Sequence, residues 1–279
     1  MNKFFKQNHY LISFLFFPFI YLLGWIIISI LIYPFPFLSL EKSLYGTIIT
    51  FLIFLLFLPI WSKYKWGKNL SQVLGVIKLI DKKLVSLLIF EFFKALIVIV
   101  FISFVAFIGG YATFLSRINN LIILNSIFLG IIVGCAEELV FRVWLFEELN
   151  LFLKKRYANL LQAIIFSIVH LRSDLNIVDN IQLLTGLFLL GFYLNKWRER
   201  NYPSILIPIC FHASIVSLWF LISNSFLNIK TNIPKTLFGP GNGIDINPIG
   251  GLLGILILFI LILDKGSSIQ KTSKNKIEN

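Results

Sequence analysis

The sequence has little charge and few residues that form disulfides. Lys, Arg, Asp and Glu make up only 14% of its 279 residues, whereas a soluble globular domain has roughly 25%. The only two cysteines, Cys135 and Cys210, lie inside apolar segments, where we expect small packing residues and no disulfide framework. An ordinary soluble enzyme and a disulfide-stabilised scaffold are therefore both excluded.

Long apolar runs take the place of charge, because 58% of the residues are hydrophobic. Each run is long enough to cross the roughly 30 Å hydrocarbon core of a bilayer as a helix, and the alternating strands of a membrane barrel are absent. The sequence predicts an all-α polytopic membrane helix bundle with about eight transmembrane helices. The predicted spans are residues 10–33, 45–61, 95–115, 121–146, 157–172, 180–197, 203–224 and 248–264.

The segment of about 70–93 mixes charged and apolar residues. This composition predicts an amphipathic interfacial helix that leads into the third span. Glu91 and Lys94 are one helical turn apart, so we expect them to form an ion pair near the surface.

The net charge of +12 is unevenly distributed. Of the 25 Lys and Arg residues, 19 fall on one side of the predicted spans: in both terminal tails and in the segments 62–94, 147–156 and 196–202. This bias is the positive-inside pattern, which predicts a multi-pass protein with both termini in the cytoplasm. The expected partner of the basic loops is the lipid bilayer with its anionic headgroups, and nucleic acid is not expected. The composition suits a bacterial inner membrane or a thylakoid membrane.

A few polar residues lie deep inside the predicted spans: Glu137, Glu138 and Arg142 in the fourth, His170 in the fifth and His212 in the seventh. Glu138 and Arg142 are four residues apart, so they share a helix face and can form an ion pair. Glu137 lies about 100° further around the helix and is free to face another neighbour. A rise of ~1.5 Å per residue places Glu137 and both histidines roughly 14–20 Å into the membrane, where one cavity could hold them.

One carboxylate and two imidazoles are the groups needed to activate water. Glu137 can take a proton, one histidine can position the water or a metal, and the other can donate to a developing oxyanion. In the non-catalytic alternative, the histidines only form hydrogen bonds to neighbouring helices, and the Glu138–Arg142 ion pair only holds two helices together.

The motifs Glu137-Glu138-x-x-x-Arg142 and Phe166-x-x-x-His170, followed by His212, resemble the three motifs of the CPBP intramembrane proteases. This family is also called the Abi or type II CAAX prenyl protease family. The resemblance covers roughly residues 117–225. It implies an eight-helix membrane endopeptidase with a water-filled cavity open to the cytoplasm.

The resemblance also implies a role for each residue. Glu137 is the general base, His170 holds the attacking water and His212 stabilises the oxyanion, while Glu138 and Arg142 form the structural pair. Glu137, His170 and His212 could instead hold a divalent metal such as zinc. A carboxylate that ligates the metal is not a free base, and we favour the mechanism without metal.

The sequence departs from the family pattern at Val216. Family members usually carry asparagine at this position, four residues after the third-motif histidine. Valine donates no hydrogen bond, and the loss of one oxyanion donor typically costs ~10²–10³ in rate.

Three regions follow from these patterns. Residues 1–116 hold the N-terminal helices and the interfacial segment, and residues 117–225 form the protease-like core. Residues 226–279 hold an external loop, the last helix and a polar cytoplasmic tail. We expect an intramembrane endopeptidase that cleaves a membrane-associated protein or peptide. The alternatives are a non-proteolytic scaffold or bacteriocin-immunity-type protein, and a transporter whose Glu137, His170 and His212 relay protons.

The basic-residue distribution makes a topology prediction. In a variant that lacks Cys135 and Cys210, a cysteine introduced at Lys68 or Lys155 should react with a membrane-impermeant thiol reagent from the cytoplasmic side. A cysteine at Lys235 should react only from the opposite side. Protection of position 155 from the cytoplasmic reagent would contradict the predicted topology.

Overall fold

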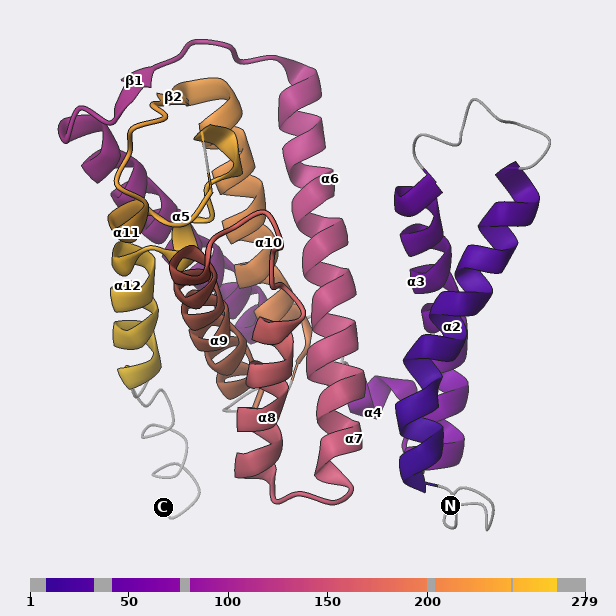
Figure 1. Cartoon of the computed structure of the whole chain (residues 1–279). Helices are drawn as coiled ribbons and strands as arrows, with labels where there is room; N and C mark the ends of the chain where they lie inside the picture. Colours follow the sequence, from indigo (N-terminus) through magenta and orange to yellow (C-terminus); the bar gives the residue numbers. More distant parts are fainter. Residues whose placement is uncertain (1–8, 33–41, 76–80, 200–203, 242, 265–279) are drawn as a thin grey trace, which may run out of the picture.

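The computed structural model describes residues 9–32, 42–75, 81–199, 204–241 and 243–264, and these residues form a helical bundle (Figure 1). The all-α fold class is confirmed, with only two three-residue strands, β1 (Ala112–Phe114) and β2 (Leu227–Ile229), in the described part. The α-helices are α2 (His9–Ile32), α3 (Lys42–Trp61), α4 (Leu70–Leu74), α5 (Lys82–Ile108), α6 (Asn120–Glu137), α7 (Phe146–Asn150), α8 (Lys155–Ile168), α9 (Ile177–Glu199), α10 (Leu206–Leu221), α11 (Lys235–Phe238) and α12 (Leu252–Leu263).

Several shorter turns join or extend these helices. Three are π-helical: η2 (Ser62–Trp66), η3 (Glu138–Leu145) and η4 (Ile222–Phe226). Two are 3₁₀ turns: η5 (Gly243–Asp245) and η6 (Pro248–Gly250). Because η3 follows α6 without a break and leads into α7, these elements form one continuous helix.

Six helical segments of the described chain are long and apolar enough to cross a membrane, fewer than the eight spans predicted. They are Leu11–Leu31, Tyr45–Trp66, Lys82–Ile108, Asn120–Asn150, Ile177–Arg198 and Leu206–Phe226. The predicted spans 157–172 and 248–264 correspond to the shorter helices α8 and α12, of 14 and 12 residues. The helix α8 stops at Ile168, just before the polar loop that carries Arg172 and Asp174, and α12 begins only after the η6 turn.

The third span differs from its prediction. A single helix, α5, runs from Lys82 to Ile108, so residues 82–93 continue the span and are not a separate interfacial helix. Its start is fixed by Asp81, whose side chain accepts a hydrogen bond from the Leu84 amide at 2.7 Å, as an N-cap does. Within the segment predicted as interfacial, α4 occupies only Leu70–Leu74.

The predicted ion pair of Glu91 with Lys94 is confirmed at 2.8 Å, but it does not lie at the surface. Glu91 is buried, and its other oxygen accepts a hydrogen bond from the Tyr193 hydroxyl of α9 at 2.9 Å. Lys94 also lies over the Trp197 ring, 4.0 Å from the centroid. The pair therefore joins α5 to α9.

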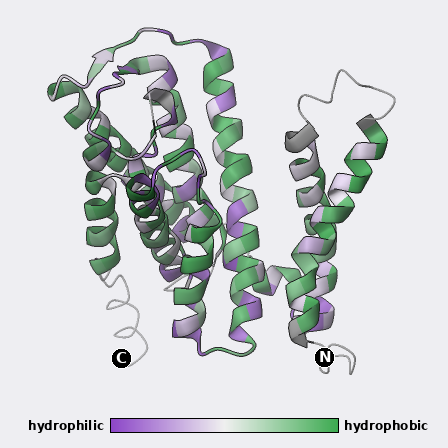
Figure 2. Ribbon diagram, viewed as in Figure 1, coloured by the Kyte–Doolittle hydropathy of each residue, from purple (hydrophilic) through white to green (hydrophobic). Residues whose placement is uncertain are grey.

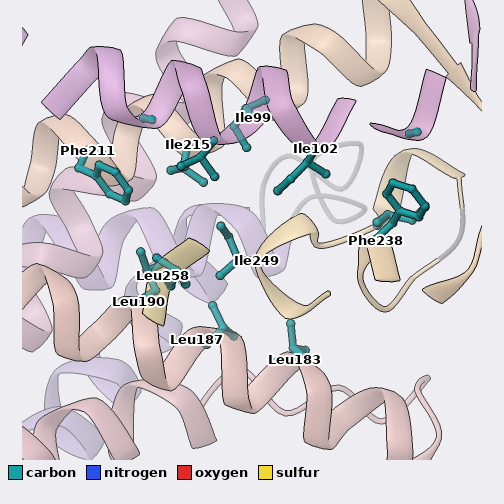
Figure 3. Close-up of a cluster of buried hydrophobic side chains, with 14 of the residues drawn as sticks. Ile99, Ile102, Leu183, Leu187, Leu190, Phe211, Ile215, Phe238, Ile249 and Leu258 are labelled. Atoms are coloured by element: carbon teal, nitrogen blue, oxygen red, sulfur yellow. The ribbon is translucent and has the colours of Figure 1, made fainter. Parts of the chain in front are cut away.

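The core of the bundle lies around α10, which packs against α5, α6 and α9. Figure 3 shows side chains from α5, α9 and α10 and from the C-terminal segment meeting in one apolar cluster. Its labelled residues are Ile99, Ile102, Leu183, Leu187, Leu190, Phe211, Ile215, Phe238, Ile249 and Leu258. This cluster fixes the position of α10, the helix that carries His212.

Two glycines allow α6 to approach α10 closely. A Cβ atom on Gly130 would lie 2.4 Å from the Ala213 carbonyl oxygen, and one on Gly134 would lie 3.0 Å from the Ala213 amide. The Ser217 hydroxyl donates to the Ser126 carbonyl across the same contact at 2.7 Å. Small residues are the usual means of bringing membrane helices together, and this contact lies directly before Glu137.

The helices are apolar over most of their length, as Figure 2 shows by the green colour of their ribbons. Large exposed hydrophobic side chains are frequent on α2, α3, α5 and α6, where a lipid environment makes exposure favourable. The chain is a multi-pass membrane protein. Helix α2 begins and α12 ends at the same end of the bundle (Figure 1), and the membrane side of that end stays a prediction.

The α6–α10 contact generates a stability prediction. Gly134→Val should lower the free energy of unfolding by ~1–3 kcal/mol, because the added side chain overpacks a contact with backbone atoms. Ile131→Val on the exposed face of the same helix is the control and should have little effect. Thermal unfolding in detergent measures both variants, and an equal loss would contradict the close packing.

Candidate active site

The polar residues predicted to act together come from three parts of the bundle. Glu137 ends α6, and Glu138 and Arg142 lie on η3. His170 follows the end of α8, and His212 lies within α10. The structure brings all five into one network.

Both histidines face the Glu137 carboxylate. Nε2 of His170 lies 3.5 Å from Glu137 Oε1, and Nε2 of His212 lies 3.7 Å from Glu137 Oε2. The side chains of Glu137 and His170 are 25% and 30% exposed, whereas that of His212 is only 6% exposed. The carboxylate is therefore accessible, and one of its two imidazole neighbours is held deep in the protein.

The opposite ring nitrogens are held by acceptors. Nδ1 of His170 lies 2.6 Å from the Phe166 carbonyl oxygen, and Nδ1 of His212 lies 2.8 Å from Glu138 Oε1. Because a carbonyl and a carboxylate accept hydrogen bonds, each Nδ1 carries the proton in the neutral ring. Each Nε2 then directs a lone pair toward Glu137, and the space between these three groups favours a proton donor such as water.

Glu138 has a second contact that the sequence did not predict. Its ion pair with Arg142 is confirmed at 3.1 Å, with both side chains fully buried. The same oxygen, Oε1, accepts the hydrogen bond from His212. Glu138 is therefore more than a structural partner, because it also fixes the orientation of the imidazole.

Phe166 is a residue whose role the motif pattern did not reveal. The Arg142 guanidinium carbon lies 4.1 Å from the centroid of its ring. The His170 ring lies 4.8 Å away, and the His212 ring packs edge-on at 6.3 Å. One aromatic ring thus separates the buried cation from both imidazoles, and a cation over a ring face is favourable.

The buried ion pair is not fully satisfied by hydrogen bonds. All three Arg142 guanidinium nitrogens and Glu138 Oε2 have no hydrogen-bond partner in the described part of the chain. The contact with Glu138 is therefore electrostatic, and it is supplemented by the Phe166 ring. Breaking such a pair exposes the remaining charge to an apolar environment, which is strongly unfavourable.

A cavity of about 260 Å³ adjoins His212. It is lined by residues of α6, α9 and α10, by Arg172 and by the segment 245–249. The family resemblance implied a cavity open to the cytoplasm. This cavity is lined by Arg172, which the basic-residue count assigns to the other side, so the side on which it opens stays a prediction. At its rim the Arg172 guanidinium, 2.6 Å from Asp174, holds the pKa of that carboxyl below its usual value.

Val216 lines the same cavity as His212. The hydroxyls of Ser214 and Ser217 do not replace the missing asparagine, because they donate to the backbone carbonyls of Cys210 and Ser126. The position that carries a hydrogen-bond donor in the family is therefore an apolar part of the cavity wall.

The donor types of Glu137, His170 and His212 suit zinc. Among the described residues, no group of three His, Cys, Asp or Glu side chains is placed to hold a metal ion. The two Nε2–oxygen distances of 3.5 and 3.7 Å are nevertheless close to the ~3.3 Å between ligands of a tetrahedral zinc. Cys135 and Cys210 are free thiols and are half-buried.

Comparison with known protein families gives two matches. Residues 119–218 match the model described as type II CAAX prenyl endopeptidase Rce1-like. Residues 2–70 match a domain of unknown function, DUF8676. Comparison with curated proteins and with solved structures found no match.

The first match confirms the predicted resemblance to the CPBP proteases. The matched segment contains the whole network from Glu137 to His212, and it begins one residue before α6 and ends within α10. The protein is a polytopic membrane protein, and its residues 119–218 are similar to a type II CAAX prenyl endopeptidase; this segment is called the CAAX protease-like domain below. The second match covers α2, α3 and η2, for which the sequence had suggested no function of their own.

The different contacts of the two glutamates generate a prediction. Glu138→Gln should lower the free energy of unfolding by ~3–5 kcal/mol, because it leaves Arg142 as an unpaired buried charge. Glu137→Gln keeps the size of a partly exposed side chain and should have a much smaller effect. Thermal unfolding of both variants in detergent tests this, and equal losses would contradict the structural role of Glu138.

Proposed function

We propose that the protein is an intramembrane endopeptidase that hydrolyses a peptide bond in a membrane-associated protein or peptide. The observation that carries this proposal is the approach of both Nε2 atoms to Glu137, at 3.5 and 3.7 Å. The Nδ1 atom of each imidazole is held by a hydrogen-bond acceptor. The two Nε2 atoms and the Glu137 carboxylate are therefore preorganised around one position. Preorganised groups lower the barrier without rearranging during the reaction.

The chemistry is a water-mediated acyl transfer. A water between Glu137 and His170 gives a proton to the Glu137 carboxylate while its oxygen attacks the substrate carbonyl carbon. The resulting oxyanion accepts a hydrogen bond from Nε2–H of His212 when that ring carries both protons, with Nδ1–H still bonded to Glu138. Glu137 then returns the proton to the leaving nitrogen, and the products are a new carboxyl group and a new amine.

A non-proteolytic scaffold is the second candidate, and Val216 is the observation that favours it. The cavity wall beside His212 lacks a hydrogen-bond donor at this position. An oxyanion bound there has one fewer partner, and each such donor is worth ~10²–10³ in rate. A scaffold that keeps the fold would not need the donor.

The two candidates predict different results for reconstituted protein. The wild type and Val216→Asn should both release new termini from a membrane-tethered peptide library, and the asparagine variant should be ~10-fold or more faster. Glu137→Gln should lower the rate by ~10² or more in either background. Mass spectrometry of the released peptides measures the cleavage.

Three controls complete this experiment. The thermal stability of each variant in detergent shows that loss of cleavage does not reflect unfolding. A chelator arm tests the metal-independent mechanism, which a zinc-reversible loss of activity would contradict. The absence of cleavage by wild type and Val216→Asn across a broad library would favour the scaffold.

A further inference from the structure

The N-terminal hairpin of α2, α3 and η2 stands beside the rest of the bundle (Figure 1). Its sequence is the part that matches a domain of unknown function. The network of Glu137, Glu138, Arg142, His170 and His212 contains no residue of this hairpin. The hairpin nevertheless meets the CAAX protease-like domain at a buried polar cluster centred on Glu148 of α7.

Glu148 accepts hydrogen bonds from four side chains of the hairpin. Its Oε1 accepts from the indole nitrogens of Trp61 and Trp66 at 2.7 and 2.8 Å. Its Oε2 accepts from the Lys65 ammonium at 2.7 Å and from the Ser13 hydroxyl. The ammonium donates to the Ser13 oxygen at 2.5 Å as well. A single carboxylate of the protease-like domain thus holds α2, the end of α3 and η2.

Burial makes this cluster different from an ordinary surface ion pair. The side chains of Lys65 and Glu148 are 0% and 2% exposed. The adjacent pair of Lys68 with Glu147 joins the same two regions at 2.6 Å, but Lys68 is 47% exposed. An exposed pair of this kind contributes little, whereas removing one partner of a buried pair leaves an uncompensated charge.

The cluster lies on the same continuous helix as the candidate catalytic residues. This helix runs from Asn120 to Asn150, and its π-helical part, η3, carries Glu138 and Arg142 between Glu137 and Glu148. Long π-helical stretches are rare and occur most often at functional sites. The contacts that hold this stretch in place therefore affect the candidate site.

Opposite sides of η3 contact different parts of the protein. Arg142 faces the core, where it lies over Phe166. Trp144 faces the hairpin, where its ring packs against Phe16 and Phe17 with centroid distances of 5.4 and 4.5 Å. The hairpin therefore contacts the π-helical stretch directly, and the Glu148 cluster anchors the next turn.

We propose that the N-terminal hairpin is a clamp that positions the carboxylates of Glu137 and Glu138, with Glu148 as its positioning residue. This inference rests on the proposed peptidase function for its catalytic consequence. The clamp holds the helix at both Trp144 and Glu148, and the 2.8 Å bond between Glu138 and His212 depends on how that helix is placed. Release of the clamp would displace the carboxylates from the imidazoles, and a misplacement of about 1 Å can cost ~10² in rate.

The test compares Glu148→Gln with its neighbour Glu147→Gln. Glu148→Gln should lower kcat for peptide hydrolysis by ~10-fold or more and change KM little, because the substrate contacts remain while the reacting groups shift. Glu147→Gln, which removes the exposed pair with Lys68 and a longer 3.8 Å contact with Arg198, should leave both constants near the wild-type values. A rise in KM with unchanged kcat for Glu148→Gln would overturn the proposal, because the hairpin would then serve substrate binding.

A second measurement does not depend on catalysis. Cys135 lies two residues before Glu137 and is half-buried, so its labelling rate reports on the position of this part of the helix. In a Cys210→Ser background, Glu148→Gln should raise the rate of Cys135 labelling several-fold, and Glu147→Gln should not. An unchanged labelling rate in Glu148→Gln would overturn the clamp. If the wild type cleaves no peptide, the proposed function fails while this measurement still decides the clamp.

Two further variants protect the test against simple misfolding. Trp66→Phe keeps an aromatic ring but removes one hydrogen bond to Glu148. It should change kcat and the labelling rate in the same direction as Glu148→Gln, by a smaller factor. The double variant Lys65→Met with Glu148→Gln removes the unpaired ammonium and keeps an amide oxygen for both indoles. It should recover the labelling rate and most of kcat. A double variant no better than Glu148→Gln would overturn the assignment of the clamp to this ion pair.

Discussion

The buried carboxylate of Glu138 is the group on which the candidate site depends. Its Oε1 atom interacts with a cation of its own helix, Arg142, and with an imidazole of another helix, His212. His212 would not be oriented toward Glu137 by packing alone, because an imidazole ring can rotate within an apolar pocket. The contact requires α6 and α10 to approach closely, which Gly130 and Gly134 allow. The close packing of α6 against α10 and the orientation of His212 by Glu138 therefore depend on each other.

Much of the site could be predicted from the sequence because charge is so rare in this chain. Charged and imidazole groups inside apolar helices are costly, so the few present stood out, and all five meet in the structure. The spacing of Glu138 and Arg142 predicted their pair correctly, since it depends only on helix geometry. The bond between Glu138 and His212 could not be predicted, because it depends on the depth and rotation of two helices that are distant in sequence.

The fold, like the site, could be predicted where it depends on local sequence and could not be predicted where it depends on tertiary packing. Hydropathy located every long helix of the described chain, yet it predicted eight spans where six described segments are long enough. It could not distinguish a membrane-spanning helix from a shorter apolar helix packed within the bundle. The Glu91–Lys94 pair was also predicted near the surface, although Glu91 is buried beside the Tyr193 hydroxyl and its ammonium partner. Only the tertiary structure shows that a buried charge has a partner of opposite charge.

The shortness of α8 has a consequence for the lipid around the protein. Its 14 residues rise only ~21 Å, well below the roughly 30 Å hydrocarbon core, and its outward side chains Tyr157, Leu160, Ile164 and Ile168 are exposed. A bilayer adapts to a short apolar surface by becoming thinner beside it. The membrane should therefore be thinned next to α8, whose last residue lies two positions before His170.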